Sequence, residues 1–236
     1  MTLMSSLVER SDQILMKRVP EIEVMDTEAE AIAYDSMDFG EVNTRFVQDA
    51  IALGVHGKIL DVGTGTARIP ILLAQELLNQ QINFQITAID LAQSMLDIAK
   101  DHLETSGLRT VIDLQVVDAK QLPYADASFD AVISNSIVHH LSEPQLFFHE
   151  LARVIKPTSG ILIRDLLRPS SYEHLDILVN TYAGDGDATQ QKLFRDSLQA
   201  SYTLTEIEQF FSAVDIDRIH IFQSSDRHWT AQRECL

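Results

Sequence analysis

The chain has 236 residues, of which 45% are apolar and 22% are charged, so it is long enough to bury a core and is not a disordered polypeptide. Its 18 basic and 35 acidic residues leave a net charge of −17, which argues against a nucleic acid partner because phosphate backbones would repel the chain. Cys235 is the only cysteine, which excludes an intrachain disulfide and a cysteine-based metal site.

The first 25 residues do not fit a signal peptide. Glu9, Arg10 and Asp12 would fall inside its apolar core, and no run of 18 or more apolar residues occurs in the chain. We therefore expect a cytoplasmic protein that does not insert into a membrane and that exists as a monomer or a homodimer.

In chain order, residues 1–55 are predicted to be a mainly helical N-terminal region, with an amphipathic helix after Gly40. Strands and helices then alternate. The strands are predicted at 58–62, 84–90, 111–118, 129–136 and 160–166, and the helices between them at 68–78, 91–107 and 144–155. A helical excursion follows at 167–211, and two β-like runs around "QSSD" indicate a closing hairpin.

This alternation predicts an α/β fold: a Rossmann-like, doubly wound, seven-stranded sheet whose last strand runs antiparallel in a hairpin with the strand before it. We expect a single domain over 1–236, in which 1–55 and 167–211 form a helical region and a cap inserted after the fifth strand. Ligands of such sheets bind beyond the carboxyl ends of the strands.

The loop in "ILDVGTGTARIPILLA" (59–74) is glycine-rich. A dinucleotide fingerprint, G-x-G-x-x-G, would need a glycine where Arg68 stands, so the pattern is broken. The spacing acidic-x-G-x-G-x-G is instead filled by Asp61, Gly63, Gly65 and Ala67. "LDVGTGTA" thereby resembles the first motif of the class I S-adenosylmethionine (SAM)-dependent methyltransferases, with alanine at the third glycine position.

The resemblance continues at the ends of the next strands. It implies that Asp90 accepts the ribose hydroxyls, that Asp118 and the backbone of Ala119 meet the adenine, and that Asn135 and Ser136 face the cofactor. A carboxylate at Asp61 suits the amino group of SAM. The resemblance implies this set of cofactor-binding residues: Tyr34, Asp61, Gly63, Thr64, Gly65, Asp90, Leu91, Met95, Asp118, Ala119, Asn135 and Ser136.

The resemblance spans roughly residues 34–167. The passages "LPYADASFDAV…HHL" and "ELARVIKP…G" are similar to the small-molecule branch that includes the ubiquinone/menaquinone C-methyltransferases. It implies transfer of a methyl group from SAM to a small-molecule acceptor by in-line displacement, with S-adenosylhomocysteine as the product. An NAD(P)-dependent oxidoreductase and a non-catalytic SAM-binding protein of the same fold stay open as alternatives.

Two further features bear on the chemistry. The tetrapeptide "SNSI" is not the Asn-Pro-Pro-aromatic motif of DNA adenine methyltransferases, and no convincing metal-binding triad stands out, so we expect no metal. His139 and His140 are candidates for a general base, with His140 preferred, although one of them could be structural.

Substrate specificity is expected to come from the two helical regions. Arg168, Tyr172, His174 and Tyr182 could line a substrate pocket, where Arg168 would suit an anionic or carbonyl-bearing acceptor; a surface arginine before a turn is the alternative. Tyr34 could close over the sulfonium by a cation–π contact, or it could be a core residue that bridges helices.

Overall fold

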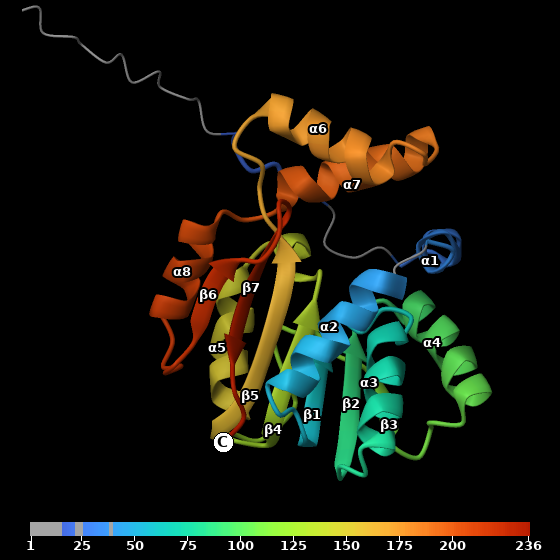
Figure 1. Cartoon of the computed structure of the whole chain (residues 1–236), viewed down its shortest axis with the longest axis vertical. Helices are drawn as coiled ribbons and strands as arrows, with labels where there is room; N and C mark the ends of the chain where they lie inside the picture. The colour runs from blue at the N-terminus through green and yellow to red at the C-terminus, as the bar shows by residue number, and fades with distance from the viewer. Residues whose placement is uncertain (1–15, 22–25, 38–39) are drawn as a thin grey trace, which may run out of the picture.

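The computed structural model describes residues 16–21, 26–37 and 40–236 (Figure 1). At its centre is a seven-stranded sheet in the order β3-β2-β1-β4-β5-β7-β6. The strands are β1 (Gly57–Val62), β2 (Phe84–Asp90), β3 (Ile112–Val116), β4 (Phe129–Asn135), β5 (Ile155–Leu166), β6 (His220–Gln223) and β7 (His228–Arg233). β1 to β5 pair in parallel, and β7 is antiparallel to both β5 and β6. The predicted Rossmann-like sheet with an antiparallel closing hairpin is confirmed.

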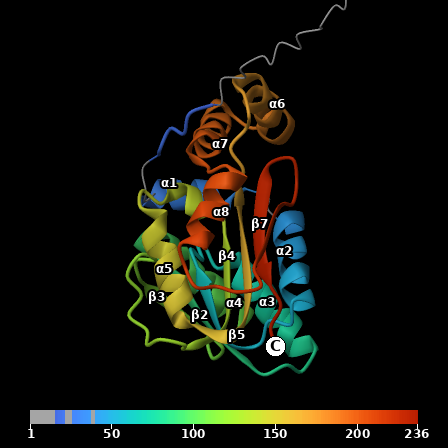
Figure 2. The ribbon, with the colours of Figure 1, turned by 90° about the vertical axis from the view of Figure 1, so that its left-hand side faces the viewer.

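Helices cover both faces of the sheet. The α-helices of the described residues are α1 (Glu28–Asp35), α2 (Gly40–Ala52), α3 (Arg68–Asn79), α4 (Gln93–Ser106), α5 (Pro144–Val154), α6 (Tyr172–Ala183), α7 (Ala188–Ala200) and α8 (Leu204–Ser212). α2 and α3 lie on one face and α5 and α8 on the other (Figure 2). Each face buries its own apolar cluster, with Phe46 and Leu73 in one and Phe148, Phe211 and Trp229 in the other.

β5 differs from its predicted bounds. It begins at Ile155, directly after α5, and not at residue 160. Ile155 pairs with Phe129, and the register then shifts before Ala131 pairs with Gly160. The irregular segment between these pairs contains Pro157, and the sequence predicts a loop there. In the structure its backbone is extended.

The N-terminal region is helical in two places, α1 and α2, whereas residues 16–21 form no helix. The rest of the expected N-terminal helical region, at 1–15, 22–25 and 38–39, lies outside the described residues. None of the helices in the described part of the chain is long and apolar enough to cross a membrane.

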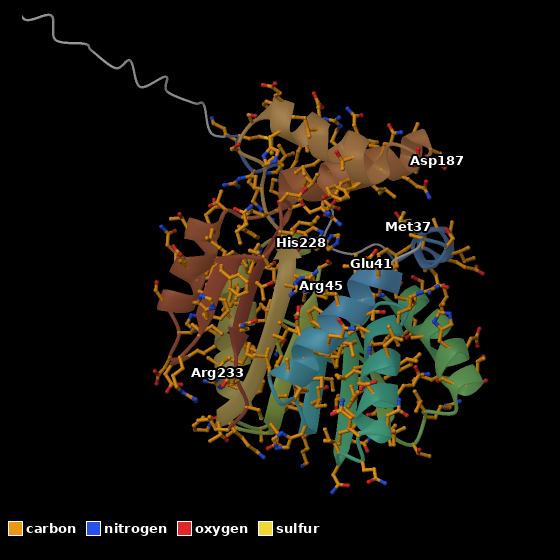
Figure 3. The ribbon with its side chains drawn as sticks, in the orientation of Figure 1. Met37, Glu41, Arg45, Asp187, His228 and Arg233 are labelled. Carbon is orange, nitrogen blue, oxygen red and sulfur yellow. The ribbon has the colours of Figure 1, made fainter. Side chains whose placement is uncertain are left out.

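α6 and α7 project beyond the carboxyl ends of the strands (Figure 1). They enclose a small apolar cluster in which Leu175, Leu178 and Leu198 pack with Leu166 of β5 and with Met16 of the N-terminal segment. Figure 3 shows Asp187 at the outer end of this helical pair, with His228 below it near the ends of the strands. α8, which the sequence places in the same excursion, packs against α5 and β6 on the face of the sheet.

Ala67, at the third glycine position of the loop, has a left-handed backbone with φ 61° and is fully buried. This conformation costs an alanine about 1–2 kcal/mol. We predict that Ala67→Gly leaves the free energy of unfolding within about 1 kcal/mol of the parent. The glycine removes the backbone strain, and this gain offsets two losses: the buried methyl group, and the higher conformational entropy of the unfolded chain. The matched control is Ala74→Gly, buried in α3, which should lower it by about 1–2 kcal/mol. Urea denaturation of both variants checks this, and equal losses would contradict the strain argument.

Candidate active site

A cavity opens at the carboxyl ends of the parallel strands. It is bordered by α1, the start of α4, and the loops that follow β1, β2, β3 and β4. Its lining residues are Tyr34, Val62, Gly63, Gly65, Ile89, Asp90, Leu91, Ala92, Met95, Val117, Asp118, Ala119, Lys120, Asn135, Ser136, Ile137, His140 and Leu141. Ten of the twelve predicted cofactor-binding residues border it; the other two, Asp61 and Thr64, are buried and are not among its lining residues.

The loop after β1 needs its two glycines for different reasons. Gly63 has φ +74°, and a Cβ there would lie 1.8 Å from Cγ2 of Ile137 in the loop after β4. Gly65 has φ +55°, and a Cβ there would lie 3.7 Å from the ring of Tyr34. Gly63 therefore permits close packing of two loops, while Gly65 keeps the space beside Tyr34 open to a ligand.

Asp61 lies in β1 just before this loop, and Thr64 stands between its two glycines. Asp61 is almost fully buried, and the buried side chain of Thr64 interacts with its carboxylate and opposes the effect of burial on its pKa. Burial raises the pKa of Asp61 to about 7, and the nearby charge of Asp90 adds to the shift. A buried carboxylate is costly unless positively charged or donating groups satisfy it, so Asp61, with Thr64 as a neutral partner, fits a ligand that carries an amino group.

Asp90 ends β2 and organises the cavity wall. Its Oδ2 accepts the N–H of Gly65 at 2.8 Å and its Oδ1 accepts the N–H of Ala92 at 2.9 Å. Burial raises the pKa of Asp90, and the backbone N–H groups oppose that shift. Leu91 and Met95 add apolar surface beside it.

Asp118 follows β3 and accepts the N–H of Lys120 at 2.9 Å, while the ammonium of Lys120 lies 3.2 Å from the same oxygen. Asn135 donates to the hydroxyl of Ser136 at 3.2 Å. Ser136 has φ 62°, a left-handed conformation that turns the chain sharply at the end of β4. Lys120 borders the cavity and was not among the residues predicted from the sequence.

α1 closes one side of the cavity with Tyr34, which is half-buried; desolvation raises the pKa of its hydroxyl to about 12. Arg68 of α3 holds the end of α1, because its guanidinium donates to the carboxylate of Asp35 at 2.9 Å and to the Asp35 carbonyl at 2.7 Å. Ahead of α1, Asp26 accepts the N–H of Ser94 in the first turn of α4 at 2.9 Å. The arginine that breaks the dinucleotide pattern therefore positions a cavity-lining tyrosine.

The histidine pair lies in a short 3-10 turn (Val138–His140) after β4. His139 is buried, with its Nδ1 2.5 Å from Oδ1 of Asp165, and Oδ2 of Asp165 accepts the backbone N–H of His139 at 3.1 Å. Burial disfavours the charged imidazole, but Asp165 and Glu21 outweigh it and raise the pKa of His139. Of the pair, His140 alone borders the cavity.

A third side chain, absent from the sequence prediction, joins the pair. Oε1 of Glu21 lies 3.1 Å from Nδ1 of His140 and 3.5 Å from Nε2 of His139. The three ligand-type atoms lie within 4.8 Å of one another, a grouping that could hold a metal ion and that the sequence did not reveal. Glu21 is more than 100 residues away from the two histidines in the chain and belongs to no recognisable motif, so nothing in the sequence grouped it with them.

The predicted substrate residues do not border the cavity. Both oxygens of Glu206 accept bonds from Arg168, at 2.9 and 2.8 Å, so this arginine anchors α8 to the end of β5. The Tyr182 hydroxyl donates to Asp226 at 2.6 Å. Tyr172 is 59% exposed at the start of α6.

Comparisons with known proteins agree with this architecture. Residues 60–163 match the model of a methyltransferase domain family. The chain is 27% identical over 128 residues to methyltransferase GfsG of Streptomyces halstedii, covering 54% of this chain and 44% of that protein. It is 32% identical over 112 residues to demethylmenaquinone methyltransferase of Desulfitobacterium hafniense (strain Y51), covering 48% of this chain and 43% of that protein.

Among solved structures, a putative S-adenosylmethionine-dependent methyltransferase from Methanococcus maripaludis superposes with a TM-score of 0.70 at 18% identity, covering 94% of this chain and 98% of that one. Residues 60–163 are thus similar to a methyltransferase domain, and the chain shares the fold of S-adenosylmethionine-dependent methyltransferases. The match spans less than half of the length of the two curated relatives above.

The close approach at Gly63 generates a prediction. Gly63→Ala should lower the free energy of unfolding by about 2–4 kcal/mol, because it adds both backbone strain and a clash with Ile137. Gly107→Ala is the matched control: Gly107 has φ +70° but nothing within 4 Å of an added Cβ, so that variant should show the strain alone, about 1–2 kcal/mol. Urea unfolding of the two variants compares them, and equal losses would show that the loops do not need this contact.

Proposed function

We propose that the cavity binds SAM and that the enzyme transfers its methyl group to a small-molecule acceptor by in-line displacement. The observation that carries the proposal is the order of Asp61, Asp90 and Asp118. These carboxylates stand at the carboxyl ends of three adjacent parallel strands, β1, β2 and β3, and Asp61 is almost fully buried.

Each carboxylate suits a different part of SAM. Asp61, just before the glycine loop, suits the amino group of the methionine moiety. Asp90 suits the ribose hydroxyls, since a carboxylate can accept two hydrogen bonds from a diol. Asp118 and the backbone of Ala119 suit the adenine edge. Tyr34 suits the sulfonium, because an aromatic face attracts a cation.

In methyl transfer the sulfonium is already an activated leaving group, so the enzyme mainly aligns the reactants and excludes water. A hydroxyl or acidic-carbon acceptor must also lose a proton. We place the acceptor end of the site at the histidine pair, because His140 borders the cavity beside Leu141. The names of the relatives, such as demethylmenaquinone methyltransferase, support a small-molecule acceptor.

The alternatives differ in what they require of the loop. An NAD(P)-dependent oxidoreductase would need a glycine where Arg68 stands, and Arg68 instead holds Asp35. A non-catalytic SAM-binding protein would share the cofactor site and lack turnover. The cytoplasmic location and the monomeric or homodimeric state stay predictions.

A thermal shift assay tests the cofactor. We expect S-adenosylhomocysteine at 100 times its Kd to stabilise the protein by about 2.7 kcal/mol, and NAD(H) and NADP(H) to give no shift. Stabilisation by a nicotinamide dinucleotide without any response to S-adenosylhomocysteine would overturn the proposal. Turnover is then measured as S-adenosylhomocysteine release with a panel of hydroxylated and enolic acceptors.

The raised pKa of Asp61 predicts a pH dependence of binding. In the free protein this carboxyl is protonated below about pH 7, and the amino group of the ligand needs its charged form. Affinity for S-adenosylhomocysteine should therefore fall as the pH drops below 7, approaching about tenfold per pH unit. Asp61→Asn should bind more weakly at pH 8 and show a flatter profile. Titration calorimetry between pH 5.5 and 8.5 checks this, and parallel profiles for parent and variant would remove Asp61 from the role.

A further inference from the structure

We propose that Glu21, His139 and His140 form a binding site for one divalent transition-metal cation of the zinc type, at the acceptor end of the cavity. The donor set is two imidazole nitrogens and one carboxylate oxygen. This set suits zinc, which uses three protein ligands at catalytic sites and leaves a fourth position open.

The spacing of the donor atoms fits such an ion. Zinc binds nitrogen and carboxylate oxygen at about 2.0–2.2 Å, which puts neighbouring donors of a tetrahedral site about 3.3–3.6 Å apart. Oε1 of Glu21 lies 3.1 Å from His140 and 3.5 Å from His139, and the three donors fall within 4.8 Å of one another. A small closing movement would bring all three to bonding distance of one ion.

The carboxylate oxygen is also short of a partner. Oε1 of Glu21 is buried and accepts no hydrogen bond of good geometry from the described residues. A buried charged oxygen in that state is costly, and a cation held between it and the two ring nitrogens would remove the cost.

A supporting residue stands behind the ligands. Asp165 is fully buried and lies 2.5 Å from Nδ1 of His139, which directs the other ring nitrogen, Nε2, toward Glu21. A carboxylate that orients a histidine in this way is the usual outer partner of a metal-binding histidine. Arg18 lies beside the cluster, donating to the His139 carbonyl at 2.9 Å.

The role of the ion rests on the proposed methyl transfer, whereas its binding does not. His140 borders the cavity, so the open position lies at the cavity wall. An acceptor hydroxyl or enol oxygen bound there would lose its proton to solvent more readily, because the cation stabilises the oxyanion. That oxygen then forms a bond to the methyl carbon as the carbon–sulfur bond breaks and its electron pair returns to sulfur. The products are the methyl ether and S-adenosylhomocysteine. The substrate class is therefore a hydroxylated or enolic small molecule.

The test uses the untagged full chain after dialysis against a chelator. Calorimetric titration with ZnCl₂ should give one equivalent bound, and Co²⁺ should give the intense visible absorption of a tetrahedral site. Glu21→Gln should weaken Zn²⁺ binding at least tenfold. His149→Gln is the matched control: His149 is an exposed histidine on α5, and its loss should leave binding unchanged.

Asp165→Asn should weaken binding about 10- to 100-fold without removing a ligand. The inference is overturned if the parent binds no stoichiometric Zn²⁺, or if Glu21→Gln binds it as tightly as the parent. S-adenosylhomocysteine is titrated into the same samples. Cofactor binding without Zn²⁺ binding overturns only the metal site, and Zn²⁺ binding without cofactor binding overturns only the proposed function.

Discussion

The carboxylate of Asp90 joins the loop after β1 to the start of α4, because its two oxygens accept the N–H groups of Gly65 and Ala92. Both N–H groups lie at the cavity wall, where loss of a partner would be costly. Burial works against the charge on Asp90, and the backbone donors support it. The carboxylate is thus held in place before any ligand arrives. A ribose diol would add hydrogen bonds to an ordered group, which lowers the entropy cost of binding.

Arg68 both breaks the dinucleotide-binding pattern of the sequence and holds the helix that stands beside the cavity. In the sequence it stands where a dinucleotide-binding loop needs glycine, and in the structure it pairs with Asp35 and so fixes α1 above the cavity. The pair is partly exposed, at 42% and 20%, and such pairs contribute at most about 1 kcal/mol. Tyr34 therefore stands on a helix whose polar attachments are individually weak, on the side of the cavity where the loop glycine leaves space.

The sequence was sufficient for the parallel sheet and for the residues at the ends of its strands, because hydrophobic runs and glycine spacing are local signals. Asp90 and Asp118 are the last residues of predicted strands, so their common edge could be inferred. Arg168 also follows a strand, yet it turns to Glu206, 38 residues further along the chain. Glu21 meets the histidine pair from more than 100 residues away, in a segment with no periodic pattern. Contacts of this kind depend on tertiary packing, which no local pattern encodes.

The acceptor end of the site depends on the N-terminal segment, the cap and the histidine turn together. Arg18 donates to the carbonyls of His139 and Ala200, and its guanidinium lies 4.1 Å from the ring centre of Tyr202. One guanidinium thus connects the histidine turn after β4 to the end of α7. Because Glu21 lies three residues beyond Arg18, the position of its carboxylate depends on that anchor. The residues that would select the acceptor therefore belong to the chain segments outside the sheet, whereas the carboxylates that we propose to bind the cofactor belong to the strand ends.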